Sequence, residues 1–220
     1  MIKALAIKEL RESAGITALA ALGMVWAIGR CMGINPIRNL IGGVYGNGHV
    51  AFLGDDFYVM AILFVGALAA LLGLKQSAWE VHHNTFHFLF HRPLARRTIL
   101  FTKLIVGMLI VFVVMATAIL IYGMWAAMPG HLASHFEWSM TVDSWLLAAT
   151  LPLVYLGGFL SGIRPGHWFG TRLIPFAAAA VWTLIVTTLV TFWWLQLPLL
   201  AFGYVCGLVA IDYYTHCRDY

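Results

Sequence analysis

Six long runs of apolar residues, separated by short polar stretches, constrain this chain more than any other feature. They cover about 14–34, 57–74, 101–126, 144–163, 173–194 and 198–215. A transmembrane helix needs ~20 predominantly apolar residues to cross roughly 30 Å of hydrocarbon, and each run approaches that length. The runs are continuous rather than alternating, which excludes a membrane β-barrel. The sequence therefore predicts an all-α membrane protein with six transmembrane helices.

Composition excludes a water-soluble domain. Of 220 residues, 62% are hydrophobic and 10% are charged, whereas globular chains are about 45–50% apolar and about 25% charged. The net charge of +4 does not indicate a nucleic-acid partner, because the basic residues stand between the apolar runs instead of forming one patch. Cys31, Cys206 and Cys217 are scattered, so they predict neither a disulfide framework nor a zinc site.

The distribution of Lys and Arg predicts the orientation in the membrane. With six crossings both termini share a side, and eleven of the 13 basic residues fall on that side, opposite Arg30 and Arg38. Basic residues favour the cytoplasmic side, so we expect both termini there, with cytoplasmic loops at about 75–100 and 164–172. Charged residues occur throughout 1–13, so we expect no cleaved signal peptide.

Ionisable side chains are nearly absent from the middle of the predicted spans. Arg30, Lys103 and Asp212 lie near span ends, where their charged groups can snorkel towards water. Asp143 opens the fourth span, where an acid suits a helix N-terminus. Because intramembrane charges usually mark ion paths, we expect no ion-coupled transport.

The polar and small residues inside the spans favour helix packing. Gly158-x-x-x-Gly162 and Gly203-x-x-x-Gly207 would allow close backbone approach. Thr183, Thr187 and Thr191 share one face of the fifth span. We interpret these threonines as hydrogen-bonding groups between helices, with the lining of a substrate path as the alternative.

Residues 1–13 predict an amphipathic helix that lies in the membrane interface and contacts lipids, ahead of a transmembrane domain at 14–220. One set of positions shares helical spacing: Ile2, Leu5, Ala6, Glu9 and Leu10. Charged residues occupy much of the remaining circumference: Lys3, Lys8, Arg11 and Glu12.

The loop between the second and third spans is unusual for its aromatic and basic residues. Residues 79–91 can form a helix that clusters Phe86, Leu89 and Phe90, and Pro93 ends it. A basic corner follows, formed by Arg92, Arg96 and Arg97. Aromatic and Arg side chains dominate interface energetics, so this short cytoplasmic helix suits the docking of a partner protein.

In these segments the chain resembles the membrane subunits of ABC-2 type transporters. Lys8-Glu9-Leu10-Arg11 is similar to the amphipathic helix that opens those permeases. The family carries a Glu, a Leu-Leu-Ser-x-Pro-Ile-Ser-Arg-like turn and a Lys entering the third span, matched here by Glu80, Leu89, Pro93, Leu94, Arg96 and Lys103. Ala95 departs from the pattern, because Ser is commoner there. The topology matches as a whole, whereas the matching residues are confined to these two segments.

This resemblance implies a permease subunit of the bacterial inner membrane that forms a homodimer or heterodimer and favours export. A separate ABC ATPase subunit would hold ATP and Mg and would dock on residues 79–97. The implied docking residues are Glu80, Phe86, Phe90, Arg92, Pro93, Arg96 and Arg97. The sequence contains no G-x-x-x-x-G-K-[ST] phosphate-binding loop, so we expect no catalytic residue and no bound cofactor in this chain.

The histidines support an alternative, a multi-histidine membrane metalloenzyme of the hydroxylase or desaturase type. His83, His87 and His91 share a helical face, and His131-x-x-x-His135 repeats a spacing that can ligate a metal. The predicted topology places the two groups on opposite sides of the membrane, so we favour histidines without a metal. A purely structural membrane protein is the third interpretation, which the absence of an ATPase partner would favour.

Overall fold

The computed structural model describes residues 2–33, 50–53, 56–79, 96–131, 135–164, 171–189 and 193–216. Within these residues the chain is helical and contains no strand, which confirms the predicted all-α class. The α-helices are α1 (Ile2–Cys31), α3 (Phe57–Leu74), α6 (Arg96–Ala127), α7 (Val142–Ile163), α8 (Ile174–Thr188) and α9 (Trp193–His216). A π-helical turn, η1 (Lys75–Trp79), continues α3, and a 3-10 turn, η2 (Trp138–Thr141), leads into α7.

Five of these helices are long and apolar enough to cross a membrane: α1, α3, α6, α7 and α9. The expected fifth span, 173–194, is represented by α8, which has 15 residues and a length of about 22 Å. That length is shorter than the ~30 Å of a hydrocarbon core. The structure thus has the character of a multi-pass membrane protein with five full-length candidate spans among its described residues.

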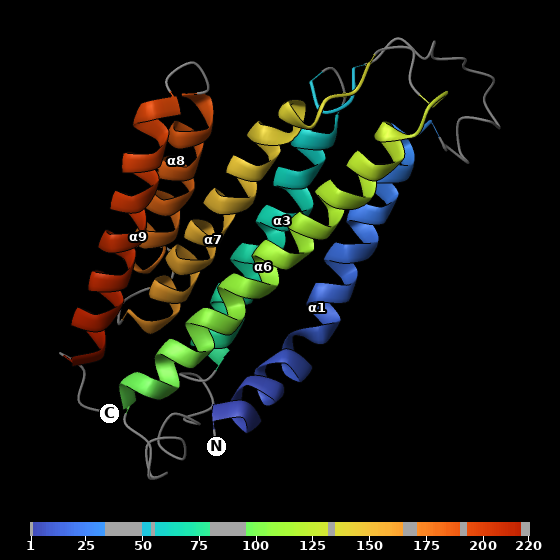
Figure 1. Ribbon diagram of the computed structural model, residues 1–220. Helices are drawn as coiled ribbons and strands as arrows, with labels where there is room; N and C mark the ends of the chain where they lie inside the picture. Colours follow the sequence, from blue (N-terminus) through green and yellow to red (C-terminus); the bar gives the residue numbers. More distant parts are fainter. Residues whose placement is uncertain are drawn as a thin grey trace.

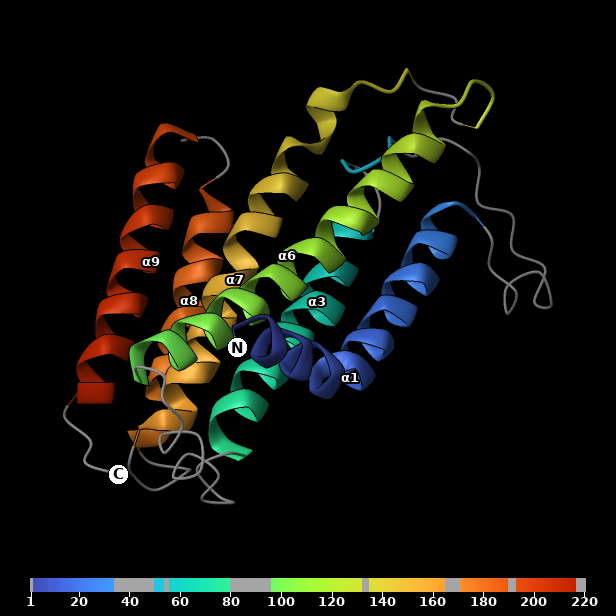
Figure 2. The same ribbon diagram turned by 60° about the horizontal axis from the view of Figure 1, so that its bottom comes forward.

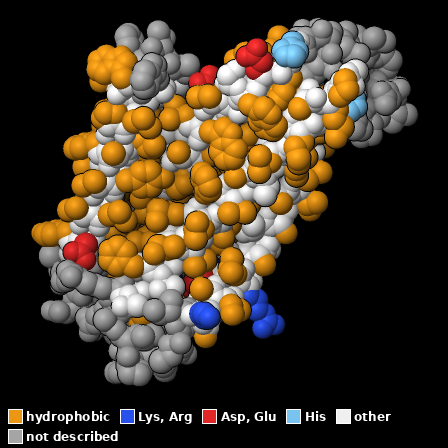
Figure 3. Space-filling view, viewed as in Figure 1, with side chains coloured by type: hydrophobic (Ala, Val, Ile, Leu, Met, Phe, Trp, Pro, Cys, Tyr) orange, Lys and Arg blue, Asp and Glu red, His pale blue; other side chains and the backbone are white. Residues whose placement is uncertain are grey.

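Helix α7 forms the centre of the bundle. Figure 1 shows successive helices running in opposite directions, with α8 and α9 on one side of α7 and α3, α6 and α1 on the other. Every residue of α7 from Thr150 to Ile163 is buried. By contrast, large apolar side chains of α1 and α9, such as Leu19, Leu22 and Val209, face outwards. Figure 3 shows hydrophobic side chains covering the middle of the molecule, as a surface in contact with lipid requires.

Most of the described basic side chains belong to residues near the end of the bundle where α1 begins and α9 ends, the lower end in Figure 1. Figure 3 shows Lys and Arg at this lower end. The described members of this group are Lys3, Lys8, Arg11, Lys75, Lys103, Arg164 and Arg172. Arg30 lies at the other end of α1, where it is partly exposed and its Nη2 lies 3.1 Å from Oδ2 of Asp56. We call the lower end the basic end of the bundle.

Helix α1 is continuous over Ile2–Cys31, so the expected interfacial segment and the first span form one helix. Figure 2 shows the first turns of α1, in dark blue, running at an angle to the rest. Near this change of direction, the Ser13 hydroxyl donates to the Leu10 carbonyl at 3.1 Å and the Thr17 hydroxyl donates to the Ser13 carbonyl at 3.0 Å. Such bonds from a side chain to the preceding turn often bend helices.

Glycines bring α3 and α7 into backbone contact, as the small-residue spacing of α7 predicted. A Cβ atom on Gly73 of α3 would collide with the Tyr155 carbonyl oxygen and lie 2.8 Å from the Phe159 nitrogen. A Cβ atom on Gly158 would lie 3.1 Å from the Ala70 carbonyl oxygen, and one on Gly162 would overlap the Ser77 side chain. These contacts require glycine because the opposing atoms are mostly backbone and cannot rotate away.

The turn between α8 and α9 lies earlier than the expected division at 195–197. Helix α8 ends at Thr188 and α9 begins at Trp193, so Pro198 lies inside α9. Pro198 lies beyond the first turn of α9, so it removes the backbone hydrogen bond to residue 194, a loss that membrane helices tolerate because neighbouring groups satisfy the freed carbonyl. Buried Gln196 donates from Nε2 to the Val186 carbonyl oxygen at 3.2 Å, which satisfies one of the free carbonyl groups at the end of α8.

We predict that Gly73→Ala lowers the thermal stability of the purified protein in detergent. The added methyl group must push α7 away from α3, and overpacking of this kind costs about 1–3 kcal/mol. The matched control is Gly66→Ala in the same helix, where the new Cβ atom would lie 3.7 Å from Leu151 Cδ2, an ordinary contact. The control should be neutral or stabilising, because alanine favours helix by about 1 kcal/mol. Equal melting temperatures for the two variants would contradict the packing argument.

Candidate functional site

A buried ion pair joins α1 to α6 at the basic end of the bundle. Lys103 Nζ lies 3.0 Å from Glu9 Oε1, and the two side chains are 0% and 2% exposed. The expectation that Lys103 snorkels is wrong, because its ammonium group points into the protein and meets a carboxylate there. An unpaired charge at this depth would be expensive, so each of the two ions makes the burial of the other tolerable.

A phenol and an amide extend this ion pair into a cluster. The Tyr155 hydroxyl of α7 lies 2.6 Å from Gln76 Oε1, to which it donates, and 3.2 Å from the Lys103 carbonyl oxygen. Gly107 makes room for the Tyr155 ring, since a Cβ atom at that position would overlap it. We call Glu9, Gln76, Lys103 and Tyr155 the buried polar cluster. It connects α1, η1, α6 and α7.

The chemistry of this cluster favours a mechanical role. Its members are between 0% and 7% exposed, so they present no reactive group at a surface. The Gln76 Nε2 amide is buried and has no hydrogen-bond partner among the described residues. Glu9 Oε1 meets the Lys103 ammonium as an ion pair at 3.0 Å, without the geometry of a hydrogen bond. Buried polar networks of this kind hold the elements that they join in a defined register.

Two further basic side chains donate hydrogen bonds to backbone carbonyl groups at the basic end of the bundle. Lys75 of η1 donates from Nζ to the Glu12 carbonyl oxygen at 2.6 Å, which links the end of α3 to α1. Arg172 donates from Nε to the Ser161 carbonyl and from Nη2 to the Gly162 carbonyl, at 3.1 and 2.8 Å. Arg172 therefore caps the last turn of α7, whose carbonyl groups lack partners within the helix.

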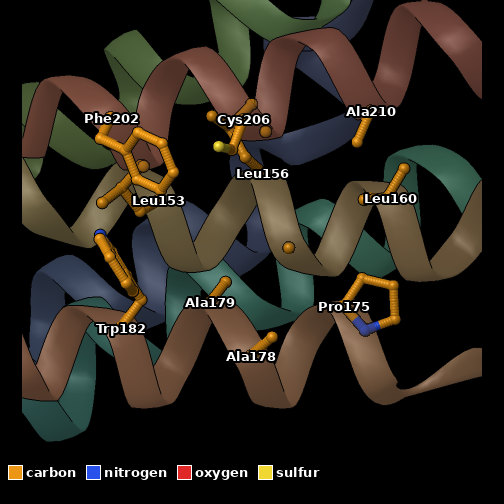
Figure 4. A pocket seen from close by; sticks show the side chains of 13 residues that line it. Leu153, Leu156, Leu160, Pro175, Ala178, Ala179, Trp182, Phe202, Cys206 and Ala210 are labelled. Atoms are coloured by element: carbon orange, nitrogen blue, oxygen red, sulfur yellow. The ribbon is translucent and has the colours of Figure 1, made fainter. Parts of the chain in front are cut away.

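An apolar pocket lies on the other side of α7. It has a volume of about 250 Å³ and is lined by α7, α8 and α9. Figure 4 shows Trp182 and Phe202 at one end and the small side chains of Ala178 and Ala179 along one wall. The Trp182 indole donates to the Leu199 carbonyl at 3.1 Å, so its polar atom is already engaged. The lining suits an apolar group, such as an acyl chain, and carries no charged side chain.

The structure describes only part of the predicted docking set. Five of its residues lie outside the described ranges: Glu80, Phe86, Phe90, Arg92 and Pro93. Arg96 and Arg97 form the first turn of α6, but their side chains are not described. The docking role of all seven residues stays a prediction.

The structure describes two of the three residues of the predicted threonine face, Thr183 and Thr187. Thr183 is buried and its hydroxyl has no hydrogen-bond partner among the described residues. The Thr187 hydroxyl donates to the Thr183 carbonyl of its own helix at 3.0 Å, while Thr191 lies outside the described ranges. The pocket does not include these threonines among its lining residues. Their role as pathway lining stays a prediction.

Of the five histidines that support the metalloenzyme alternative, the structure describes His131 and His135. His83, His87 and His91 lie outside the described residues. His131 stacks on Trp125 with ring centroids 5.0 Å apart, and its Nδ1 lies 3.0 Å from the Trp125 carbonyl oxygen. Within the described part of the chain, no group of three His, Cys, Asp or Glu side chains could hold a metal ion.

Sequence reasoning missed Gln76 and Tyr155 and did not pair Glu9 with Lys103. A usable signal was present, because each of the two charged residues interrupts an otherwise apolar stripe on its own helix. Two opposite charges at the same predicted depth are candidates for pairing. Nothing in the sequence distinguishes Tyr155 from tyrosines that serve as packing.

The fold and the cluster define a multi-pass helical membrane protein whose helices are connected through a buried polar network. Comparison of the chain with protein-family models, curated proteins and solved structures finds no match. The resemblance to ABC-2 type permeases therefore rests on the residues of the chain itself.

We predict that Glu9→Gln and Lys103→Met each destabilise the protein by about 3–5 kcal/mol, because each leaves the opposite charge buried without a partner. The double variant should recover most of this loss, since it contains no buried charge. A double-mutant cycle on denaturation in detergent measures the coupling. Lys8→Met is the matched control, because Lys8 pairs with Glu12 at 3.5 Å while half-exposed and such pairs contribute about 0–1 kcal/mol. Additive losses in the double variant would disprove a buried ion pair.

Proposed function

We propose that the chain is the membrane permease subunit of an ABC-2 type ATP-driven exporter, coupled to a separate ATPase subunit. The supporting observation is the contact between Glu9 and Lys103. Both residues belong to the segments that carry the family resemblance, Lys8-Glu9-Leu10-Arg11 and the entry to α6. These segments are far apart in the sequence, yet the structure pairs them as buried ions at 3.0 Å. Such a pairing is expected if the two segments form one working unit.

The buried polar cluster offers a route for mechanical coupling. The proposed docking segment, 79–97, lies between η1 and the first turn of α6. Gln76 ties η1 to the cluster and Lys103 ties α6 to it, so both flanks of the docking segment are connected to the same buried groups. A displacement of that segment by an ATPase would move α7 through Tyr155 and α1 through Glu9. Rigid elements that share a packed junction change arrangement together.

The remaining parts of the proposal follow from the same assignment. The basic end of the bundle faces the cytoplasm of a bacterial cell, where an ATPase that holds ATP and Mg is available. Two permease chains, identical or different, assemble around one translocation path. The apolar pocket between α7, α8 and α9 suits hydrophobic or amphipathic cargo.

We predict that Arg96→Glu combined with Arg97→Glu abolishes co-purification of the ATPase that accompanies the wild-type chain from its native host. Reversing two interface arginines should cost more than 2 kcal/mol, which weakens binding at least about thirtyfold. Membrane insertion should be unchanged, because the substituted residues lie at the start of α6 and outside the apolar stretch.

Arg30→Glu is the control, because Arg30 lies at the opposite end of the bundle and is partly exposed. It should leave co-purification intact. Retention of the ATPase by the Arg96/Arg97 variant would refute the docking assignment. Failure of the wild-type chain to co-purify with any ATPase would refute the transporter proposal as a whole.

A further inference from the structure

The first turns of α1 present an outward face that differs from the one expected. Ile7 follows Lys3 by four residues, and Leu10 and Arg11 follow Ile7 by three and four, so all four lie on one side of the helix. All four are exposed, and the exposed fractions of Ile7 and Leu10 are 65% and 51%. The sequence pattern had grouped Leu10 with Leu5 and Glu9. We call Lys3, Ile7, Leu10 and Arg11 the basic α1 face.

The acidic residues in the first turns of α1, Glu9 and Glu12, lie on other sides of the helix. Leu5, Glu9 and Ser13 form the opposite, buried side of the helix, where Glu9 is neutralised by Lys103. Glu12 lies on the flank, where its carboxylate is 3.5 Å from the Lys8 ammonium. Within the described part of the chain, no ion pair joins Lys3 or Arg11 to a carboxylate. The basic α1 face therefore carries two cations around an apolar centre, and no acid lies on it.

This arrangement fits the boundary between headgroups and acyl chains. Exposed isoleucine and leucine between two cations are unfavourable in water, whereas an interfacial helix buries such apolar residues among acyl chains and directs Lys and Arg to the phosphates. The location agrees, because these turns lie at the basic end of the bundle and run at an angle to the membrane-spanning part of α1 (Figure 2). Cationic segments beside a membrane are attracted to anionic lipids.

We propose that the basic α1 face is a binding site for anionic phospholipids. Lys3 and Arg11 contact the headgroup phosphates, and Ile7 and Leu10 enter the acyl boundary. The apolar centre distinguishes a lipid from a free phosphate ion, which would gain nothing from Ile7 and Leu10. The proposal does not depend on ATP-driven transport, since it uses only the charge and exposure of this face.

The test measures lipid affinity of the purified full-length chain in detergent by native mass spectrometry, with phosphatidylglycerol and phosphatidylcholine as probes. We expect tighter binding of phosphatidylglycerol. Lys3→Gln and Arg11→Gln should each weaken it about fivefold, and together they should remove the preference over phosphatidylcholine. Ile7→Ser with Leu10→Ser should weaken both lipids. Lys8→Gln is the matched control, because Lys8 lies on the flank and already pairs with Glu12, and it should change affinity less than twofold.

Three results of the lipid measurements would overturn the proposal. The first is equal affinity of the wild-type chain for the two lipids, and the second is an equal effect of Lys8→Gln and Arg11→Gln. The third is competition by glycerophosphoglycerol as strong as that by the intact lipid, which would identify a soluble phosphate compound as the ligand. Circular dichroism of each variant verifies that α1 remains folded. Loss of a co-purified acidic protein with unchanged lipid binding would instead assign the face to protein docking.

Discussion

The attraction between Glu9 and Lys103 is the interaction on which the basic end of this bundle depends. Neither group is accessible to water, so the Coulomb energy between them is only weakly screened. The pair is not a simple source of stability, because removing two ions from water costs free energy of similar size. The pair instead determines how α1 and α6 pack against each other. One arrangement of the two helices pairs both charges, whereas other arrangements leave an unpaired ion in an apolar core.

This constraint works together with the close packing around α7. Gly73, Gly158 and Gly162 bring the backbones of α3 and α7 together, and Gly107 admits the Tyr155 ring beside α6. The phenol can then reach both Gln76 and the Lys103 carbonyl. Small residues therefore bring the helices close together, and the polar side chains are then near enough to form hydrogen bonds between them. A cluster of this kind would not assemble between helices separated by leucine side chains.

The sequence was informative where hydrophobicity alone decides the structure. The run at 57–74 coincides with α3, and the glycine spacing of α7 predicted close helix packing. It was less informative where a contact with another helix decides the position of a side chain. Lys103 looked free to snorkel because a single helix cannot show the carboxylate that faces it. Leu10 was grouped with Leu5 and Glu9, although it faces outwards, because helical spacing alone does not say which side meets the bundle. The α8–α9 turn was displaced because Gln196, a polar residue in an apolar run, indicated a loop, whereas its amide serves the end of α8. The docking segment at 79–97 remains a prediction for its side chains.

The short length of α8 has a consequence for the surrounding lipid. Neighbouring helices can cross a bilayer of ordinary thickness, whereas the 15 residues of α8 cannot do so without adjustment. Bilayers respond to such hydrophobic mismatch by thinning locally, at a cost of fractions of a kcal/mol per ångström. Because Val181, Leu184 and Ile185 of α8 face outwards, we expect this thinning along the flank of the molecule that α8 forms. The protein is therefore expected to partition into thinner regions of membrane and to orient itself with that flank towards them.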